Sequence, residues 1–260
     1  MRIQDKFAQL NKMNEKALIA YVCAGDPGTE ATKDIVGALV RGGADIVELG
    51  LPFSDPVADG PTIQAASHRA LDAGMNPDEY FKLISSIGSG VPLVCMTYYN
   101  LIYKRGLEKF ASDCASSGIS GIIVPDLPAE ESDDLHTACR KHGVDLIFLV
   151  TPVTNEARMK KILGKTSGFV YIVSRLGVTG TQADVSHSTK KILSRVHTDV
   201  PKAVGFGISD REQACEVIAA GADAVIVGSA FVNIIASGEN VNERVETLTR
   251  ELKQACRGGN

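Results

Sequence analysis

Eight short apolar runs recur along the 260-residue chain, and they limit its possible folds more than any other feature. Valine, isoleucine and leucine dominate the runs, and apolar residues at helical spacing fill several intervals between them. Apolar runs that alternate with helices are typical of parallel strands with both faces buried. The runs lie at 17–22, 45–49, 92–96, 121–125, 145–150, 169–174, 202–206 and 223–228. The clearest helical patterns lie at 30–41, 107–117, 131–142 and 241–256.

Eight strand–helix pairs over about 250 residues predict an α/β fold, a (β/α)8 TIM barrel with an extra N-terminal helix. No linker or low-complexity segment divides the chain, so we expect residues 1–260 to form a single barrel domain. The rival fold is an open doubly wound sheet, but its usual GxGxxG signal is missing, since 25–28 reads Gly-Asp-Pro-Gly. Ser209 and Glu212 fit a capping box that opens another helix.

Composition excludes several classes of protein. The chain is 44% hydrophobic and 22% charged with a formal net charge of −4, which is ordinary for a soluble globular protein. No basic excess exists to neutralise phosphates, so we expect no nucleic-acid partner. Apolar stretches such as 146–150 are far too short to span a membrane. The six cysteines and five histidines lack metal-ligand and disulfide spacings, which predicts no metal site and a reducing, cytoplasmic location.

The connection after the second run, 50–74, is longer than the others and rich in aspartate, proline and glycine. Long connections inside compact domains are usually functional, and the loops that follow the strands form the active-site face of a TIM barrel. We therefore expect a long loop after strand 2 to carry part of the site. Asp55 and Asp59 lie in it, although Asp-Pro and Asp-Gly pairs are also plain turn chemistry.

Glu48 lies at the end of the second run, directly before this loop. Strand alternation directs Ile46 and Glu48 to the same face, which we expect to be the inside of the barrel. A carboxyl group there is partly desolvated, and this raises its pKa and suits it to hold or give a proton. The alternative is a Glu48 paired with a lysine or arginine on a neighbouring strand. With either aspartate, Glu48 would place two carboxyl groups in one pocket.

Three glycine-rich segments, 175–180, 205–209 and 228–230, follow the sixth, seventh and eighth runs. Glycine lets backbone N–H groups approach an anion closely, and a helix N-terminus adds positive potential. In TIM barrels phosphate binds typically after the last two strands, beside a short extra helix. Each glycine could also serve only as a turn, but together the segments predict a phosphate site. Other strand ends carry Tyr21, Tyr98, Asn100 and Asp126, which could line the pocket or only hold a loop.

These motifs, in this order, resemble the tryptophan synthase alpha subunit family over essentially the whole chain. The segment 47–61, VELGLPFSDPVADGP, is the most specific match, and shorter matches lie at 24–27, 174–180, 205–209 and 228–230. The resemblance implies a carbon–carbon lyase of tryptophan biosynthesis, which cleaves indole-3-glycerol phosphate to indole and glyceraldehyde 3-phosphate. It implies no metal or organic cofactor in this chain. Glu48 would be the catalytic acid and base, and Asp59 the catalytic carboxylate that accepts a hydrogen bond from the indole N–H.

The resemblance also implies roles for further residues. Segments 53–60 and 177–186 would be lids that face a separate beta subunit in an alpha2-beta2 heterotetramer, where pyridoxal phosphate joins indole to serine. Tyr21 stands where well-known family members have phenylalanine. The residues implied in substrate binding are Tyr21, Tyr98, Tyr171, Thr179, Gly180, Gly207, Gly228 and Ser229. Those implied in lid or partner contacts are Asp55, Asn100, Asp126 and Arg175.

Two alternative functions remain open at this point. A stand-alone indole-3-glycerol phosphate lyase would share the site but release indole rapidly without a partner. A non-catalytic regulatory subunit would bind a phosphorylated ligand and activate another protein. The presence of both Glu48 and Asp59 argues against the second alternative.

Overall fold

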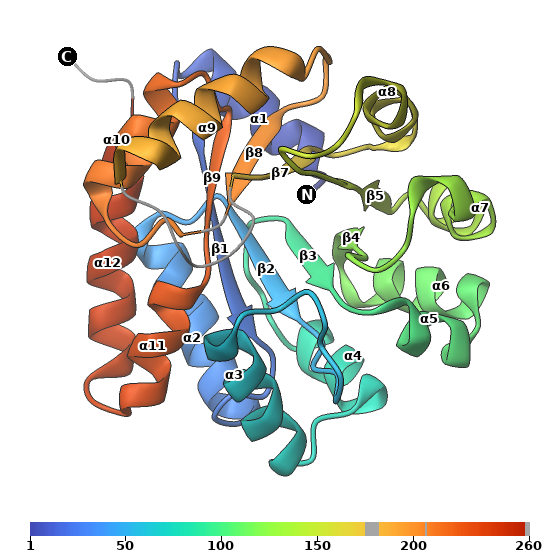
Figure 1. Ribbon diagram of the computed structural model, residues 1–260. Coiled ribbons are helices and arrows are strands. Elements are labelled where there is room, and N and C mark those ends of the chain that lie inside the picture. The colour runs from blue at the N-terminus through green and yellow to red at the C-terminus, as the bar shows by residue number, and fades with distance from the viewer. Residues whose placement is uncertain (175–181, 206, 258–260) are drawn as a thin grey trace.

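All eight apolar runs form strands, and the strands pair in parallel around a barrel (Figure 1). The structure is a computed structural model that describes residues 1–174, 182–205 and 207–257. Its strands are β1 (Ala17–Cys23), β2 (Ile46–Gly50), β3 (Leu93–Met96), β4 (Ile119–Ile123), β5 (Asp145–Ile147), β6 (Leu149–Val150), β7 (Val170–Val173), β8 (Lys202–Gly205) and β9 (Ala224–Val227).

The fifth predicted strand, 145–150, is the position at which the barrel closes. It is divided into β5 and β6 by Phe148 alone; β5 pairs with β4, and β6 pairs with β7. The full order is β5-β4-β3-β2-β1-β9-β8-β7-β6, so the two ends of the sheet belong to one stretch of chain. The TIM-barrel prediction is therefore confirmed, and the open doubly wound sheet is not what forms.

Helices surround the barrel, and the four predicted from apolar spacing correspond to α2, α6, α7 and α12. The α2 and α12 helices pack against each other on the left side of Figure 1. The helices are α1 (Ile3–Lys12), α2 (Thr29–Gly42), α3 (Pro61–Asp72), α4 (Pro77–Ser85), α5 (Tyr99–Arg105), α6 (Leu107–Ser117), α7 (Asp133–His142), α8 (Glu156–Lys165), α9 (Gln182–Arg195), α10 (Arg211–Ala219), α11 (Ser229–Ser237) and α12 (Val241–Cys256), with a 3-10 turn, η1 (Ala129–Glu131).

The capping box expected at Ser209 and Glu212 is wrong in its register. Asp210 is the N-cap of α10, and its side chain accepts a hydrogen bond from the backbone N–H of Gln213 at 2.9 Å. Ser209 instead donates its backbone N–H to the Gln213 side chain at 2.7 Å. Both serine and aspartate are good N-cap residues, so the sequence alone could not separate these two adjacent positions.

The extra N-terminal helix α1 covers the end of the barrel at which the strands begin, at the top of Figure 1. Its buried residues Ile3, Phe7 and Leu10 join the apolar side chains of the barrel interior. Ile3 reaches so far in that a Cβ on Gly121 would lie 2.8 Å from its Cδ1 atom. A larger residue at this position of β4 would therefore force the Ile3 side chain to move.

Strand β2 alternates as expected. Val47 and Leu49 belong to the layer between strands and helices, whereas Ile46 belongs to the barrel interior. Glu48 lies next along the inner face, opposite Tyr21 in the register of β1 and β2. The second strand therefore delivers a carboxyl group to the mouth of the barrel, where the carboxyl ends of the strands meet.

Two aspartates secure the amino-terminal end of the barrel in the same way. Asp45, directly before β2, accepts hydrogen bonds from the Leu18 backbone N–H at 2.9 Å and from the Lys253 ammonium at 2.8 Å. Asp223, directly before β9, accepts from a backbone N–H of β8 and from Lys16, each at 3.0 Å. The first site is buried and the second is partly open to water. Both aspartates lie at the end of the barrel opposite Glu48, where they stabilise the pairing of the strands.

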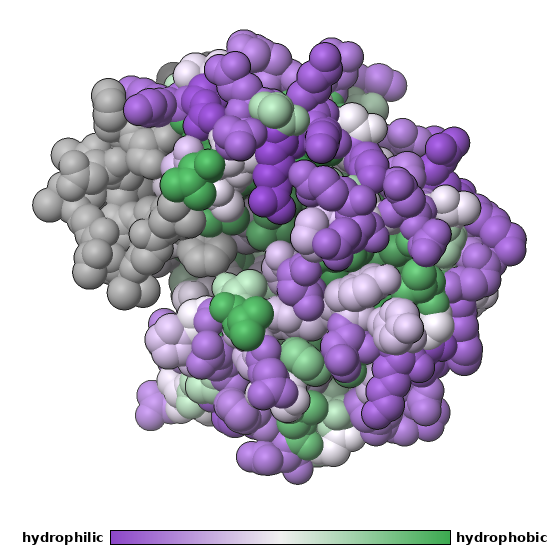
Figure 2. Space-filling view, turned by 45° about the vertical axis from the view of Figure 1, so that its right-hand side comes forward, coloured by the Kyte–Doolittle hydropathy of each residue, from purple (hydrophilic) through white to green (hydrophobic). Residues whose placement is uncertain are grey.

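The outer surface is mostly hydrophilic on the face drawn in Figure 2, with hydrophobic side chains scattered over it. The large hydrophobic residues that are exposed are Met1, Met13, Val57, Tyr103 and Val153. Within the described part of the chain, no helix combines the length and apolar character that a membrane crossing needs.

Candidate active site

Glu48 carries a buried carboxyl group in the mouth of the barrel. Its side chain is only 3% exposed, and its Oε2 atom has no hydrogen-bond partner. Loss of water raises its pKa from 4.5 to about 8, and the nearby charge of Asp59 adds to this shift. The alternative of an ion-paired Glu48 is wrong for the described residues, because none of their lysines or arginines forms an ion pair with it. At neutral pH Glu48 therefore holds its proton.

Asp59 is the second carboxyl group, carried by the loop between β2 and α3. Its backbone N–H donates to the Pro56 carbonyl at 3.1 Å, and its own carbonyl accepts from the Gln64 side chain at 2.8 Å. Partial burial raises its pKa from 3.8 to about 6, while a hydrogen bond with Tyr98 opposes the rise. At neutral pH Asp59 is therefore mostly a carboxylate. The two interacting carboxyl groups therefore have opposite protonation states at neutral pH.

Tyr98 holds the loop that carries Asp59. It is buried at the N-terminus of α5, and its hydroxyl oxygen accepts a hydrogen bond from the Ala58 backbone N–H at 3.0 Å. The Phe53 ring stacks on the Tyr98 ring with their centroids 5.3 Å apart and their planes at 27°. Tyr98 thus contacts the loop at Phe53 and at Ala58. Between these two contacts lies the exposed tip of the loop, where Val57 is 84% exposed.

Tyr21 and Tyr171 occupy equivalent positions over glycines of neighbouring strands. The Tyr21 ring lies against Gly50 of β2, and a Cβ on Gly205 of β8 would lie 2.5 Å from the Tyr171 hydroxyl. Only glycine leaves room for these rings. Burial raises the pKa of both tyrosines, and the charges of Glu48 and Asp59 contribute to each shift. Both tyrosines therefore lie near the two carboxyl groups, in the part of the barrel where the family resemblance implies substrate binding.

The expected phosphate end of the site is partly described. Gly207 has φ +79°, a conformation that favours glycine, and it is exposed after β8. Gly228 is the N-cap of α11, the short extra helix, and Ser229 is its first residue and exposed. The N-terminus of this nine-residue helix can attract an anion. The expected site residues Arg175, Thr179 and Gly180 lie outside the described residues.

Three of the residues expected at lids or partner contacts are described, and all three are exposed on elements that follow strands β2, β3 and β4. Asp55 is exposed on the loop after β2 and accepts a hydrogen bond from the Ser54 hydroxyl at 2.6 Å. Asp126, exposed after β4, accepts from the Tyr99 backbone N–H at 2.9 Å and so caps α5. Asn100 is exposed on the first turn of α5. Asp126 thus does hold a loop in place, which was one of its two expected roles.

A buried ion pair behind the mouth was missed by the sequence analysis. Asp26, 1% exposed after β1, accepts two hydrogen bonds from the Arg69 guanidinium on α3, at 2.8 and 2.7 Å. The pair ties the turn after β1 to the helix that follows the Asp59 loop. Its only sequence signal was an aspartate in a Gly-Asp-Pro turn. Among the described residues, no group of three or more His, Cys, Asp or Glu side chains could hold a metal ion.

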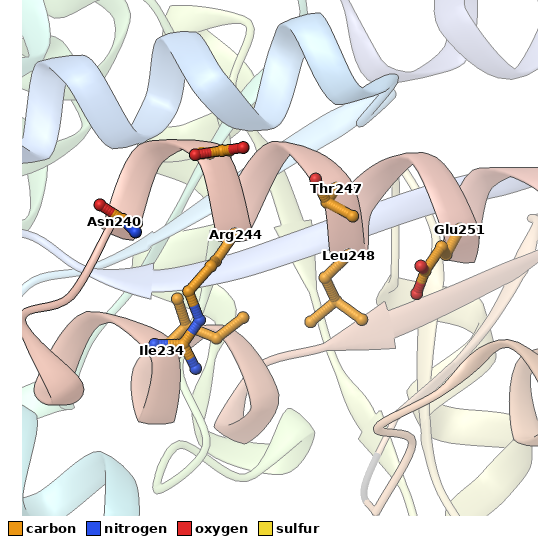
Figure 3. Close-up of a pocket in the computed structure, with 7 residues that line it drawn as sticks. Ile234, Asn240, Arg244, Thr247, Leu248 and Glu251 are labelled. Atoms are coloured by element: carbon orange, nitrogen blue, oxygen red, sulfur yellow. The ribbon is translucent and has the colours of Figure 1, made fainter.

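A surface groove between α11 and α12, with a volume of about 400 Å³, lies apart from these groups (Figure 3). Neither Glu48 nor Asp59 contributes to it. It is lined by Ile234, Asn240, Glu243, Arg244, Thr247, Leu248 and Glu251. The carboxyl groups of the barrel mouth, and not this groove, are therefore the candidate site.

A TIM barrel with a protonated and an ionised carboxyl group in its mouth has the arrangement of an enzyme that works by acid–base catalysis. The chain matches the family described as tryptophan synthase alpha chain over residues 7–257, and it belongs to that family. It is 62% identical over 259 residues to the tryptophan synthase alpha chain of Methanosarcina acetivorans, covering 100% of this chain and 95% of the relative.

Solved structures agree with this assignment. The tryptophan synthase subunit alpha of Legionella pneumophila has a TM-score of 0.90 at 33% identity, and the comparison covers 98% of each chain. A tryptophan synthase structure from Mycobacterium tuberculosis has a TM-score of 0.90 at 37% identity and covers 99% of each chain. The family suggested by the sequence motifs is thus confirmed over nearly the whole length.

Proposed function

We propose that this chain cleaves indole-3-glycerol phosphate to indole and glyceraldehyde 3-phosphate, with Glu48 as the catalytic acid and base and Asp59 as the catalytic carboxylate. Residues 1–260 would form one barrel domain for this reaction. The observation that carries the proposal is the buried Glu48 carboxyl group, which lacks a hydrogen-bond partner at Oε2 and has a pKa of about 8. Beside it, Asp59 has a pKa of about 6. Such a pair can offer one proton and one negative charge at neutral pH.

The first step is protonation of the indole ring. Protonated Glu48 gives its proton to C3 of the indole, which places a positive charge on the ring nitrogen. The Asp59 carboxylate accepts a hydrogen bond from the ring N–H and stabilises that charge. The indole ring then has the capacity to accept an electron pair, and Glu48 has become a carboxylate.

The second step breaks the carbon–carbon bond. The Glu48 carboxylate removes the proton from the hydroxyl group adjacent to the scissile bond, and the O–H electrons form the aldehyde carbonyl. The electrons of the broken bond return to the ring and restore neutral indole. Glu48 ends with the proton that it needs for the next cycle, so the reaction needs no metal, cofactor or external base.

The remaining residues would position the two ends of the substrate. Tyr21, Tyr98 and Tyr171 would line the indole end, because all three rings are buried or half-buried beside the carboxyl groups. Gly207, Gly228 and Ser229 would hold the phosphate through backbone N–H groups and the N-terminus of α11. Thr179 and Gly180 are proposed for the same phosphate site by family resemblance.

We further propose that the chain works with a beta subunit in an alpha2-beta2 assembly in the cytoplasm. The beta subunit would carry pyridoxal phosphate and consume the indole, and this chain itself would hold no cofactor. Asp55, Asn100, Asp126 and Arg175 would serve the lids or the contact with that partner. The exposed positions of the first three around the barrel mouth support this role.

Indole release from indole-3-glycerol phosphate tests the proposal directly. The purified chain would be assayed alone and with a tryptophan synthase beta subunit. Slow release alone that the beta subunit accelerates is the expected result. Fast release without acceleration would identify a stand-alone lyase, and no release under either condition would overturn the proposed reaction.

A further inference from the structure

The hydroxyl group of Tyr21 has no described hydrogen-bond partner in the mouth of the barrel. The residue is 6% exposed, and no residue in the described ranges forms a hydrogen bond with its side chain. Its pairing with Glu48 places it on β1 directly beside β2. A phenylalanine ring would satisfy the packing at this position, so the packing leaves the hydroxyl unexplained.

The hydroxyl points toward the base of the loop that carries Asp59. It is the atom that a Cβ on Gly50 would meet first, and Gly50 is the last residue of β2 before that loop. The charges of Asp59 and Glu48 both act on it, the charge of Asp59 more strongly. A donor with no partner among the described residues thus lies near two carboxyl groups, of which Asp59 is the one ionised at neutral pH.

The proposed reaction needs Asp59 as a carboxylate, yet few hydrogen-bond donors stabilise its charge. Tyr98 is the one side chain in the described ranges whose hydrogen bond lowers the pKa of Asp59, and desolvation outweighs it. Substrate entry removes more water from the site, and this disfavours the charged form further. A second donor would offset that loss.

We propose that Tyr21 is a positioning residue for Asp59, whose hydroxyl donates a hydrogen bond to the Asp59 carboxylate once substrate fills the mouth. The bond keeps Asp59 ionised and aimed at the indole N–H in the complex. The inference rests on the proposed function, since it assigns this duty to Tyr21 within the same reaction. Tyr171, the equivalent tyrosine over Gly205, serves as the comparison, because the charge of Glu48 affects its pKa more strongly than the charge of Asp59 does.

The pH dependence of Asp59 depends on the groups around it as well. The groups that interact with it come from β1, β2, the start of α5 and β7, and they are Cys23, Glu48, Tyr98 and Tyr171. The Asp26–Arg69 ion pair acts in turn on Cys23. Replacing Tyr21 by phenylalanine leaves all of them in place and removes one oxygen atom.

The test compares wild type, Tyr21→Phe and Tyr171→Phe in the full chain. In Tyr21→Phe we expect the acid limb of kcat to move up by about one pH unit, since the charged form of Asp59 loses a donor in the complex. The acid limb of kcat/KM, which reports the free protein, stays in place. In Tyr171→Phe the acid limb of kcat stays in place.

A binding measurement makes the same comparison without turnover. The probe is an indole alkyl phosphate that lacks the cleavable hydroxyl group. We expect Tyr21→Phe to bind it about tenfold more weakly above the acid limb and equally below it, because one pKa unit corresponds to a tenfold change. Equal affinities and an unmoved acid limb of kcat would overturn the inference, as would a shift of the alkaline limb alone. Either result would leave the proposed function intact, since wild-type turnover tests that separately.

Discussion

Phe53 stacks on Tyr98, and together with the hydrogen bond from Ala58 to the Tyr98 hydroxyl this fixes the loop that brings Asp59 to the mouth. The position of Asp59, the proposed catalytic carboxylate, therefore depends on a contact between its loop and Tyr98, which follows the carboxyl end of β3. Loops are ordinarily the least stable part of a fold, so an aromatic anchor of this kind has local consequences that can be measured.

Phe53→Ala should loosen this loop without unfolding the barrel. Aromatic pairs contribute about 0.5–1.5 kcal/mol beyond burial, so cleavage of the loop by a protease should become about three- to tenfold faster. The rate of indole formation should fall while the thermal midpoint changes little. Val57→Ala on the same loop is the control, because Val57 is 84% exposed and should change neither quantity in the isolated chain. Equal protease sensitivity of both variants would contradict the anchor.

The pH profile of kcat/KM should be bell-shaped, with an acid limb at about 6 for Asp59 and an alkaline limb at about 8 for Glu48. Activity needs Asp59 ionised and Glu48 protonated, so it rises through the first pKa and falls through the second. The two groups interact, and the limbs therefore belong to the pair. Loss of activity only on the acid side would exclude Glu48 as a proton donor.

Glu48→Gln should abolish cleavage and yet stabilise the protein in alkali. Acid–base catalysis supplies about 10²–10⁴-fold in rate, which glutamine cannot provide. The pKa of Glu48 is raised from 4.5 to about 8 on folding, so its contribution to stability is present below 4.5 and is lost as pH rises toward 8. We expect Glu48→Gln to exceed wild type by about 3–5 kcal/mol above pH 8, with the gap closing toward pH 4.5. Denaturant unfolding at several pH values measures this gap, and a gap independent of pH would contradict the raised pKa.

Gly207→Asp should weaken binding of glycerol phosphate by charge repulsion. Gly207 has φ +79°, so any side chain at this position also adds backbone strain. The effect of the charge must therefore be measured separately from the effect of the strain. Gly207→Asn is the matched control, since asparagine tolerates this conformation and has nearly the same size. We expect about tenfold or more loss of phosphate affinity for aspartate relative to asparagine, by calorimetry. Equal affinities would place the phosphate elsewhere.

Asp45→Ala should destabilise the barrel more than Asp223→Ala. Each aspartate accepts from a strand N–H and from a lysine, but the Asp45 side chain is 8% exposed and that of Asp223 is 32% exposed. Breaking a buried ion pair costs up to about 3–5 kcal/mol, whereas an exposed pair contributes about 0–1 kcal/mol. Glu15, 2.9 Å from the Lys253 ammonium, keeps the loss at Asp45 below the upper figure. Denaturant midpoints measure the difference, and kcat should hold in both variants. An equal loss of stability would mean that the backbone bond, and not the lysine, dominates.

Local patterns predicted most of the fold. Period-two alternation correctly directed Glu48 inward and Val47 outward, because this direction follows from the strand geometry alone. One strand was displaced: β4 begins at Ile119, two residues before the predicted run at 121–125. Gly118 ends α6 with φ +95°, so the strand can begin at once, and Pro125 has no N–H to extend it.

The contacts that organise the site could not be predicted in this way. Tyr98 and Ala58 are 40 residues apart, and Asp26 and Arg69 are 43 apart. A pairing at that distance depends on which strand ends meet in the barrel, and no local spacing encodes it. The sequence therefore predicted Glu48, Asp59 and the tyrosines as site residues, but the protonation states of the two carboxyl groups follow only from the observed burial and neighbours.

Apolar side chains of the strands fill the barrel interior, and α1 closes its amino-terminal end with Ile3 and Phe7, so no passage runs along the barrel axis. A molecule that enters beside Tyr21 and Glu48 cannot pass through to the other side. Substrate and both products must pass through the same opening at the barrel mouth, and a product that leaves slowly would block entry of the next substrate molecule. A protein bound over that opening would thereby determine where the released indole goes.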